Sequence, residues 1–147
     1  MTRPRLAVRA LILHDDRLLI VNAYPGDRSD LWCAPGGGVE SHASLPDNLA
    51  REVMEETGLA IAVGPLAFVN EFHSPERGFH QVEVFFRATV TDSALDPSWT
   101  DPEGVVNRRR FVTRDELSRL RHKPDSLADH AWGTCGPAYD PLETQVI

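Results

Sequence analysis

The stretch GGVESHASLPDNLAREVMEETGL, residues 37–59, decides the fold. It opens on a glycine-rich turn and continues as a segment with helical periodicity, whose apolar stripe is made by Leu45, Leu49 and Val53. The hydroxyl of Ser44 can cap the start of this helix, and Gly58 suits the left-handed position that ends one. The sequence therefore predicts a glycine-rich loop followed by a helix between these two caps.

Three glutamates crowd near the end of the predicted helix. Residues three and four positions apart share a helical face, so Glu52, Glu55 and Glu56 lie within about 100° of arc. Carboxylates this close repel one another, and Mg²⁺ or Mn²⁺ relieves the repulsion because hard cations prefer oxygen ligands. Arg51 can pair with Asp47 or with Glu55 at helical contact spacing. The pattern indicates a metal site, with a solvated, ion-paired helix face as the alternative for any single glutamate.

The same stretch resembles the Nudix box, G-x5-E-x7-R-E-U-x-E-E-x-G-U, in which U is a bulky aliphatic residue. The matching positions are Gly37, Arg51, Glu52, Val53, Glu55, Glu56, Gly58 and Leu59. Glu40 matches a glutamate often found in the family's loop. Two positions depart, because His42 stands where glycine is usual and Ala43 replaces the first box glutamate. We expect Ala43 in the first turn of the helix, with Glu40 or Asp47 able to replace the missing carboxylate.

The resemblance implies an α/β fold, the Nudix-like α/β/α sandwich with a mixed, curved sheet. It also implies a magnesium- or manganese-dependent hydrolase of phosphoric anhydride bonds. The expected metal ligands are the backbone carbonyl of Gly36 and the side chains of Glu52, Glu55 and Glu56. Glu52 or Glu103 is expected to act as the base, and Asp101 is a weaker alternative to Glu103. The residues expected to support the box are Gly37, Arg51 and Gly58.

The substrate is predicted from weaker signals. Pro75 lies beyond the box at about the place where a proline accompanies ADP-ribose pyrophosphatases of this superfamily, which makes ADP-ribose the favoured substrate. A modified nucleoside triphosphate is the alternative, and the departure at Ala43 keeps open a non-catalytic nucleotide-sensing domain. Trp32 could stack on a base, Arg28 could bind phosphate and His80 could touch phosphate or ribose, although core packing or simple exposure would explain each of them as well.

The remaining sequence predicts a mixed α/β chain around the box. Strands are expected over 6–13, 18–22, 61–63, 66–72, 81–90 and 108–112. Thr113 and Glu116 form a capping box for a second helix that runs through Leu120. From about His122 the chain is rich in proline and glycine, and we expect it to be mostly irregular.

Composition limits the partners. The chain has 147 residues, which fits one domain over 1–147, and a formal net charge of −7. An acidic protein is a poor non-specific ligand for nucleic acid or an anionic membrane, so we expect neither as a partner. The family resemblance implies a small-molecule nucleotide as the partner, and a homodimer is left open. Cys33 and Cys135 form no C-x-x-C pair, and idle thiols are consistent with the reducing cytoplasm.

Overall fold

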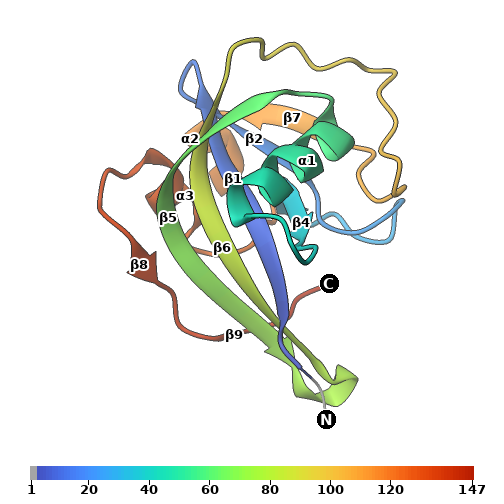
Figure 1. Ribbon diagram of the computed structural model, residues 1–147, viewed down its shortest axis with the longest axis vertical. Coiled ribbons are helices and arrows are strands. Elements are labelled where there is room, and N and C mark those ends of the chain that lie inside the picture. Colours follow the sequence, from blue (N-terminus) through green and yellow to red (C-terminus); the bar gives the residue numbers. More distant parts are fainter. Residues whose placement is uncertain (1–2) are drawn as a thin grey trace.

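One mixed sheet of nine strands organises residues 3–147, the part of the chain that this computed structural model describes (Figure 1). The strands are β1 (Arg5–His14), β2 (Arg17–Asn22), β3 (Trp32–Cys33), β4 (Gly36–Gly38), β5 (Ile61–Ser74), β6 (Phe79–Val90), β7 (Arg109–Val112), β8 (Ala138–Tyr139) and β9 (Glu143–Thr144). The helices are α1 (Leu45–Thr57), α2 (Arg114–Ser118) and α3 (Leu127–Trp132), and a 3₁₀ turn spans Pro75–Arg77.

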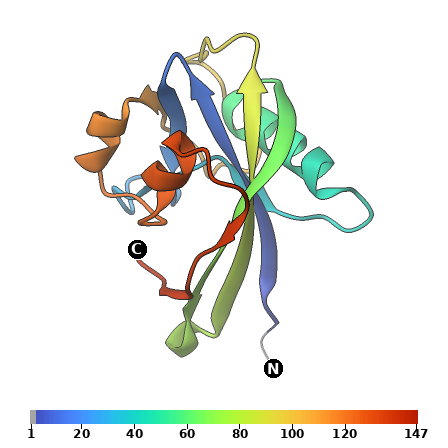
Figure 2. The same cartoon turned by 90° about the vertical axis from the view of Figure 1, so that its left-hand side faces the viewer.

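The strand order is β3-β2-β1-β6-β5-β8, with β4 beside β1, β7 beside β2 and β9 beside β5. β1 and β6 run parallel, whereas β5 and β6 form a long antiparallel hairpin. α1 lies across one face of the curved sheet, and α2 and α3 lie on the other side (Figures 1 and 2). The expected α/β/α sandwich with a mixed, curved sheet is therefore confirmed.

Two apolar clusters hold these layers together. The cluster under α1 includes Val8, Ala10, Ile12, Leu19, Leu49 and Val53. The cluster under α2 and α3 includes Leu11, Phe68, Phe85, Leu117, Leu127 and Ala131. Successive side chains of β1 thus point to opposite faces, as the period of a strand requires. Each large side chain buried in this way contributes roughly 1.5–3 kcal/mol, which fixes α1 firmly against the sheet.

The caps of α1 are those that the sequence predicts. The hydroxyl of Ser44 accepts a hydrogen bond from the Asp47 backbone N–H, and Gly58 adopts the left-handed conformation with φ of 75°. The position of Ala43 differs from the expectation. Because Ser44 is the capping residue, Ala43 lies before the helix, in the loop, and not in its first turn.

Two further segments differ from the sequence prediction. The strands expected over 61–63 and 66–72 form one strand, β5, because bulges on either side of Leu66 carry it past Gly64 and Pro65 without ending it. The segment from His122, expected to be mostly irregular, includes α3 and the short strands β8 and β9, both of which pair in parallel with β5. No helix within 3–147 is both long and apolar enough to cross a membrane.

Candidate functional site

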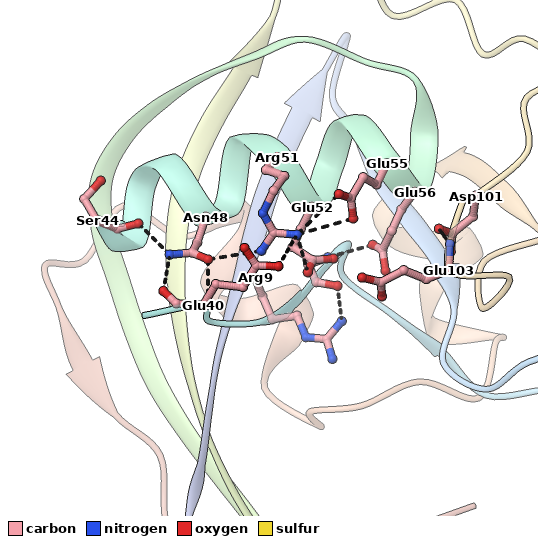
Figure 3. Close-up of polar contacts among 11 residues, drawn as sticks. Arg9, Glu40, Ser44, Asn48, Arg51, Glu52, Glu55, Glu56, Asp101 and Glu103 are labelled. Carbon is pink, nitrogen blue, oxygen red and sulfur yellow. Dashed lines mark hydrogen bonds and ion pairs between the residues drawn. The ribbon is translucent and has the colours of Figure 1, made fainter. Parts of the chain in front are cut away.

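Three carboxylates from two separate segments converge at the C-terminal end of α1. Glu52 and Glu55 project from the helix, and Glu103 reaches them from the loop between β6 and β7 (Figure 3). One oxygen of each side chain lies within 4.8 Å of the others. The donor set is made of oxygen atoms only, which suits a hard divalent cation. The structure therefore brings the loop glutamate Glu103 to the helical pair.

Glu56 is buried like Glu52, with 7% of its surface exposed against 4% for Glu52. Its Oε1 accepts a hydrogen bond of 2.8 Å from the backbone N–H of Gly36. Burial raises the pKa of Glu56 to about 8, although the charge of Arg9 and the Gly36 N–H act in the opposite direction. Proton and cation would thus compete for this carboxylate.

The glycine-rich loop touches the carboxylates so closely that side chains would not fit. A Cβ atom at Gly37 would lie 2.5 Å from Oε2 of Glu52. The backbone carbonyl of Gly36 accepts a hydrogen bond of 3.3 Å from Nη1 of Arg9. Since a carbonyl oxygen has two lone pairs, this bond leaves Gly36 one further position for a cation. The carboxylates within 4.8 Å of one another are those of Glu52, Glu55 and Glu103. Binding of a cation by the Gly36 carbonyl and by Glu56 stays a prediction.

Arg51 offsets the repulsion among the acidic residues. Its Nη1 lies 3.1 Å from Oε1 of Glu52, 3.4 Å from Oε2 of Glu55 and 3.7 Å from Oε1 of Glu40. Of its two partners proposed from helical spacing, the structure brings it to Glu55, whereas Asp47 uses its backbone N–H in the cap of α1. Burial, and then the charge of Glu103, raises the pKa of Glu52, and Arg51 opposes that shift.

Asn48 holds the loop that departs from the box. Its side-chain nitrogen donates to the carbonyls of Glu40, Ala43 and Ser44, and its oxygen accepts from the Glu40 N–H at 2.8 Å. The buried side chain therefore replaces the loop's missing backbone partners. His42, at the other departing position, has a φ of 73°, in the left-handed region that glycine occupies most easily.

The loop that carries Glu103 is fastened to α1. Asp101 is buried, and its carboxylate accepts hydrogen bonds from the backbone N–H groups of Glu103, Val105 and Val106. Its oxygens are thus occupied in shaping the loop, which makes it a poor alternative to Glu103. Trp99 adds a clamp, because its indole N–H donates to the backbone carbonyl of Glu55 at 2.8 Å and its ring lies against Gly58.

A cleft of about 190 Å³ adjoins this site on the sheet face opposite α1. Its apolar and aromatic walls include Tyr24, Leu31, Phe72, Phe79 and Val146. Its polar groups include Arg5, Asn70, Gln81, Glu83, Lys123 and Gln145. Arg9 connects the two regions, because it lines the cleft and also donates to the Gly36 carbonyl beside Glu56.

The four side chains considered for substrate contact lie outside the lining of this cleft. Trp32 packs against the core beneath the guanidinium of Arg108. Arg28 stacks over the ring of Tyr24, which does line the cleft. His80 pairs with Glu71 at 2.8 Å, and Pro75 begins the 3₁₀ turn between β5 and β6.

The sequence analysis missed the polar residues that the sheet directs into the cleft. Asn70, Gln81 and Glu83 are all buried, and the last two alternate along β6 with residues of the other face. A period-two pattern with polar residues at inward positions is a signal for a lined cleft, because buried polar groups need partners. Figure 2 shows why the sequence could not complete the set, since the C-terminal segment lies far from β6 in sequence and beside the β5–β6 hairpin in space.

The chain is similar in sequence to proteins of one known family. A family model described as NUDIX domain matches residues 3–131. Among curated relatives, a putative ADP-ribose pyrophosphatase of Bacillus subtilis is 27% identical over 132 residues, which are 85% of this chain and 59% of that protein. Mouse diphosphoinositol polyphosphate phosphohydrolase 3-alpha is 36% identical over 114 residues, 75% of this chain and 64% of that protein. The chain thus spans about three fifths of the length of these relatives.

Solved structures show the same architecture. A NUDIX hydrolase from Nitrosomonas europaea superimposes with a TM-score of 0.72 at 25% identity, over 86% of this chain and 85% of that one. A MutT NUDIX hydrolase from Burkholderia pseudomallei gives a TM-score of 0.73 at 22% identity, over 87% of this chain and 98% of that one. The second likeness is one of fold alone.

Proposed function

The chain belongs to the NUDIX domain family, and from that premise we propose that it is a divalent-cation-dependent pyrophosphohydrolase of nucleoside diphosphates linked to another group. ADP-ribose is the favoured substrate. Addition of water across its diphosphate would give AMP and ribose 5-phosphate. The observation that carries the proposal is the convergence of Glu52, Glu55 and Glu103 within 4.8 Å, beside a cleft large enough for part of a nucleotide.

Mg²⁺ or Mn²⁺ fits the donor atoms at this site. Glu52, Glu55, Glu56 and Glu103 would hold it through carboxylate oxygens, together with the carbonyl of Gly36. When bound, such ions neutralise diphosphate charge and make a bound water more acidic. Every proposed ligand is an oxygen donor, and no softer ligand is needed to complete the set.

The chain's own residues would orient the groups and accept the proton. Arg51 holds Glu52 and Glu55 in place, and the N–H of Gly36 orients Glu56. The proton of the attacking water would pass to Glu52 or Glu103, which are the two candidates for the general base. Glu103 is exposed and Glu52 is largely buried, so only Glu103 can exchange its proton directly with solvent. Comparing turnover and Mn²⁺ binding in Glu52→Gln and Glu103→Gln separates the base from a residue that only binds metal.

The charges in the cleft favour a nucleoside over a polyphosphorylated ring. Arg9 is paired with Glu83 at 2.7 Å, and Lys123 is paired with Glu143 at 3.3 Å. The third cation, Arg5, donates to the neutral amide of Gln81. A diphosphoinositol polyphosphate, which the name of the mouse relative implies as a substrate, would need several unpaired cations. The cleft also offers the aromatic rings of Tyr24, Phe72 and Phe79 and the amides of Asn70, Gln81 and Gln145, which suit a base.

The test is a substrate panel in Mg²⁺ and in Mn²⁺, with products resolved by chromatography. The panel contains ADP-ribose, the canonical nucleoside triphosphates and a diphosphoinositol polyphosphate. We expect the highest kcat/KM for ADP-ribose, with AMP as product, no turnover in EDTA and recovery when the cation is restored. A higher kcat/KM for a triphosphate would replace the substrate, and full activity in EDTA would refute the metal-dependent mechanism. The absence of turnover on every compound would favour a nucleotide sensor.

A further inference from the structure

One wall of the cleft comes from chain that the family model does not cover. Residues 138–147, named here the C-terminal strap, follow the matched region, which ends at residue 131. The strap runs parallel to β5 through β8 and β9 and lies along the β5–β6 hairpin in both views (Figures 1 and 2). It supplies Glu143, Thr144, Gln145 and Val146 to the cleft. This wall of the cleft is therefore formed by the C-terminal strap, which lies outside the part of the chain that matches the family model.

The strap is held in place at several points. Asp140 is buried and accepts a hydrogen bond of 2.6 Å from the hydroxyl of Ser126, while Nε2 of His130 lies 3.1 Å from its other oxygen. Glu143 pairs with Lys123, and the backbone N–H of Gln145 donates to the His73 carbonyl at 2.8 Å. The wall is therefore built into the fold, and its side chains have defined positions relative to the sheet.

Gln145 carries a buried acceptor without a partner. Tyr24 donates its single hydroxyl hydrogen to the backbone carbonyl of Val146 at 2.9 Å. The Tyr24 oxygen can therefore only accept from Gln145, whose Nε2 lies 3.4 Å away, and this fixes which end of the amide faces the tyrosine. The opposite end, Oε1, is buried and has no hydrogen-bond partner among the residues described. Such a group costs about 1–3 kcal/mol unless a donor reaches it.

We propose that Gln145 is a specificity-determining residue. Its side-chain carbonyl, which is shielded from water in this structure, turns toward the substrate and accepts a hydrogen bond from the exocyclic amino group of the nucleobase. For ADP-ribose that group is the adenine amine, and the assignment rests on the proposed function. Phe72 and Phe79, with ring centroids 5.8 Å apart, line the same cleft and offer faces on which a base can stack. If the base carried a carbonyl in place of the amine, its oxygen would face Oε1 of Gln145. Both atoms are acceptors, so they could not form a hydrogen bond.

The experiment compares AMP with IMP, which share the same ribose and phosphate and differ in the substituent at C6 and in the hydrogen that IMP carries on N1. Neither contains a phosphoric anhydride bond, so calorimetric binding in Mg²⁺ does not depend on hydrolysis. We expect the full-length protein to bind AMP about 10-fold more tightly than IMP, the preference that one satisfied buried acceptor supplies. In Gln145→Met and in Gln145→Ala the ratio of the two Kd values should fall to about one. Leu142→Ala, an exposed strap residue outside the cleft lining, should keep the preference.

Three results would overturn the assignment. They are equal affinity for AMP and IMP in the natural protein, a preference that survives in both folded Gln145 variants, and no AMP binding at millimolar concentration. Equal affinities for AMP and IMP would mean that Gln145 contacts the ribose or no part of the ligand. The proposed reaction can fail separately, because a Gln145-dependent preference without turnover of ADP-ribose would leave the base assignment standing. Glu56→Gln should lose turnover and keep the AMP preference.

Discussion

The two ends of the Nudix box differ in what they tolerate. At the helical end, residues 51–59, every specified position has the family's residue, whereas at the loop end both His42 and Ala43 depart. The structure explains the difference. At the helical end, Glu52 and Glu55 belong to the acidic cluster with Glu103. The loop end is held by hydrogen bonds between Asn48 and backbone groups, which do not depend on the side chain at position 43. In this box, the residues that form the acidic cluster are therefore different from those that set the conformation of the loop.

The largest effect is expected at Glu56, a buried carboxylate on the same helix as Glu52 and Glu55. Glu56→Gln keeps the size of the side chain and an acceptor for the Gly36 N–H, but it removes the charge that would bind the cation. Turnover of ADP-ribose at limiting Mg²⁺ should fall more than about 100-fold, since even the loss of an outer-shell partner costs 10–100-fold. A folded variant with nearly natural turnover would contradict the role of Glu56 in cation binding. The helical end of the box would then be no more sensitive to substitution than the loop end.

The same substitution should raise stability when no metal is present. Burial raises the pKa of Glu56 to about 8 from its ordinary value of 4.5, so the native state binds this proton more tightly than the unfolded chain does. The resulting stabilisation is complete below pH 4.5 and is lost as the pH rises through about 8. In EDTA at pH 9, Glu56→Gln should therefore be more stable than the natural protein by a few kcal/mol. Thermal unfolding at pH 9 and at pH 5 checks the sign, since the advantage should shrink at the lower pH.

The clamp between Trp99 and α1 gives the next effect. Trp99→Phe keeps an aromatic ring against Gly58 but loses the hydrogen bond to the Glu55 carbonyl, so the loop that carries Glu103 should be held less firmly. We expect Mn²⁺ affinity, measured by calorimetry, to fall about 10-fold. Trp132→Phe is the matched control, because its indole N–H contacts Asp16 in the β1–β2 turn. An unchanged Kd in the Trp99 variant would show that Glu103 reaches the cluster without this clamp.

The sequence predicted what depends on local periodicity. Ser44 and Gly58 cap α1 as expected, and the helical spacing places Glu52 near Glu55. Periodicity could not choose Glu103 over Asp101, because the choice depends on three backbone N–H groups that turn back onto the Asp101 carboxylate. The cleft was also beyond local reasoning, since it joins alternate residues of distant strands to the strap at residue 145. The roles assigned to the site residues stay predictions until a cation or a nucleotide is bound.

Restoring the family residue at the loop end should change little. Position 43 lies outside the helix, and Arg51 already has Glu40, Glu52 and Glu55 within 4.0 Å, so a new carboxylate at Ala43→Glu would only compete for the same guanidinium. An exposed ion pair contributes about 0–1 kcal/mol, and we expect kcat/KM for ADP-ribose to change by less than about threefold. Glu40→Gln alone and combined with Ala43→Glu tests whether Glu40 replaces the missing glutamate. Activity that appears only in Ala43→Glu would identify the natural protein as a disabled hydrolase.

The smallest effect is expected at His42, where only backbone conformation is involved. Its φ of 73° costs a non-glycine residue about 1 kcal/mol, and His42→Gly removes that cost while making the unfolded chain more flexible. The balance should raise the unfolding free energy by about 0.5 kcal/mol, or the Tm by about 1–2 °C, with kcat/KM unchanged. His42→Ala separates the causes, because alanine keeps a Cβ atom in the left-handed region and should bring no gain. If both variants gained equally, the imidazole would be responsible, and the glycine usual at this position would need another explanation than backbone strain.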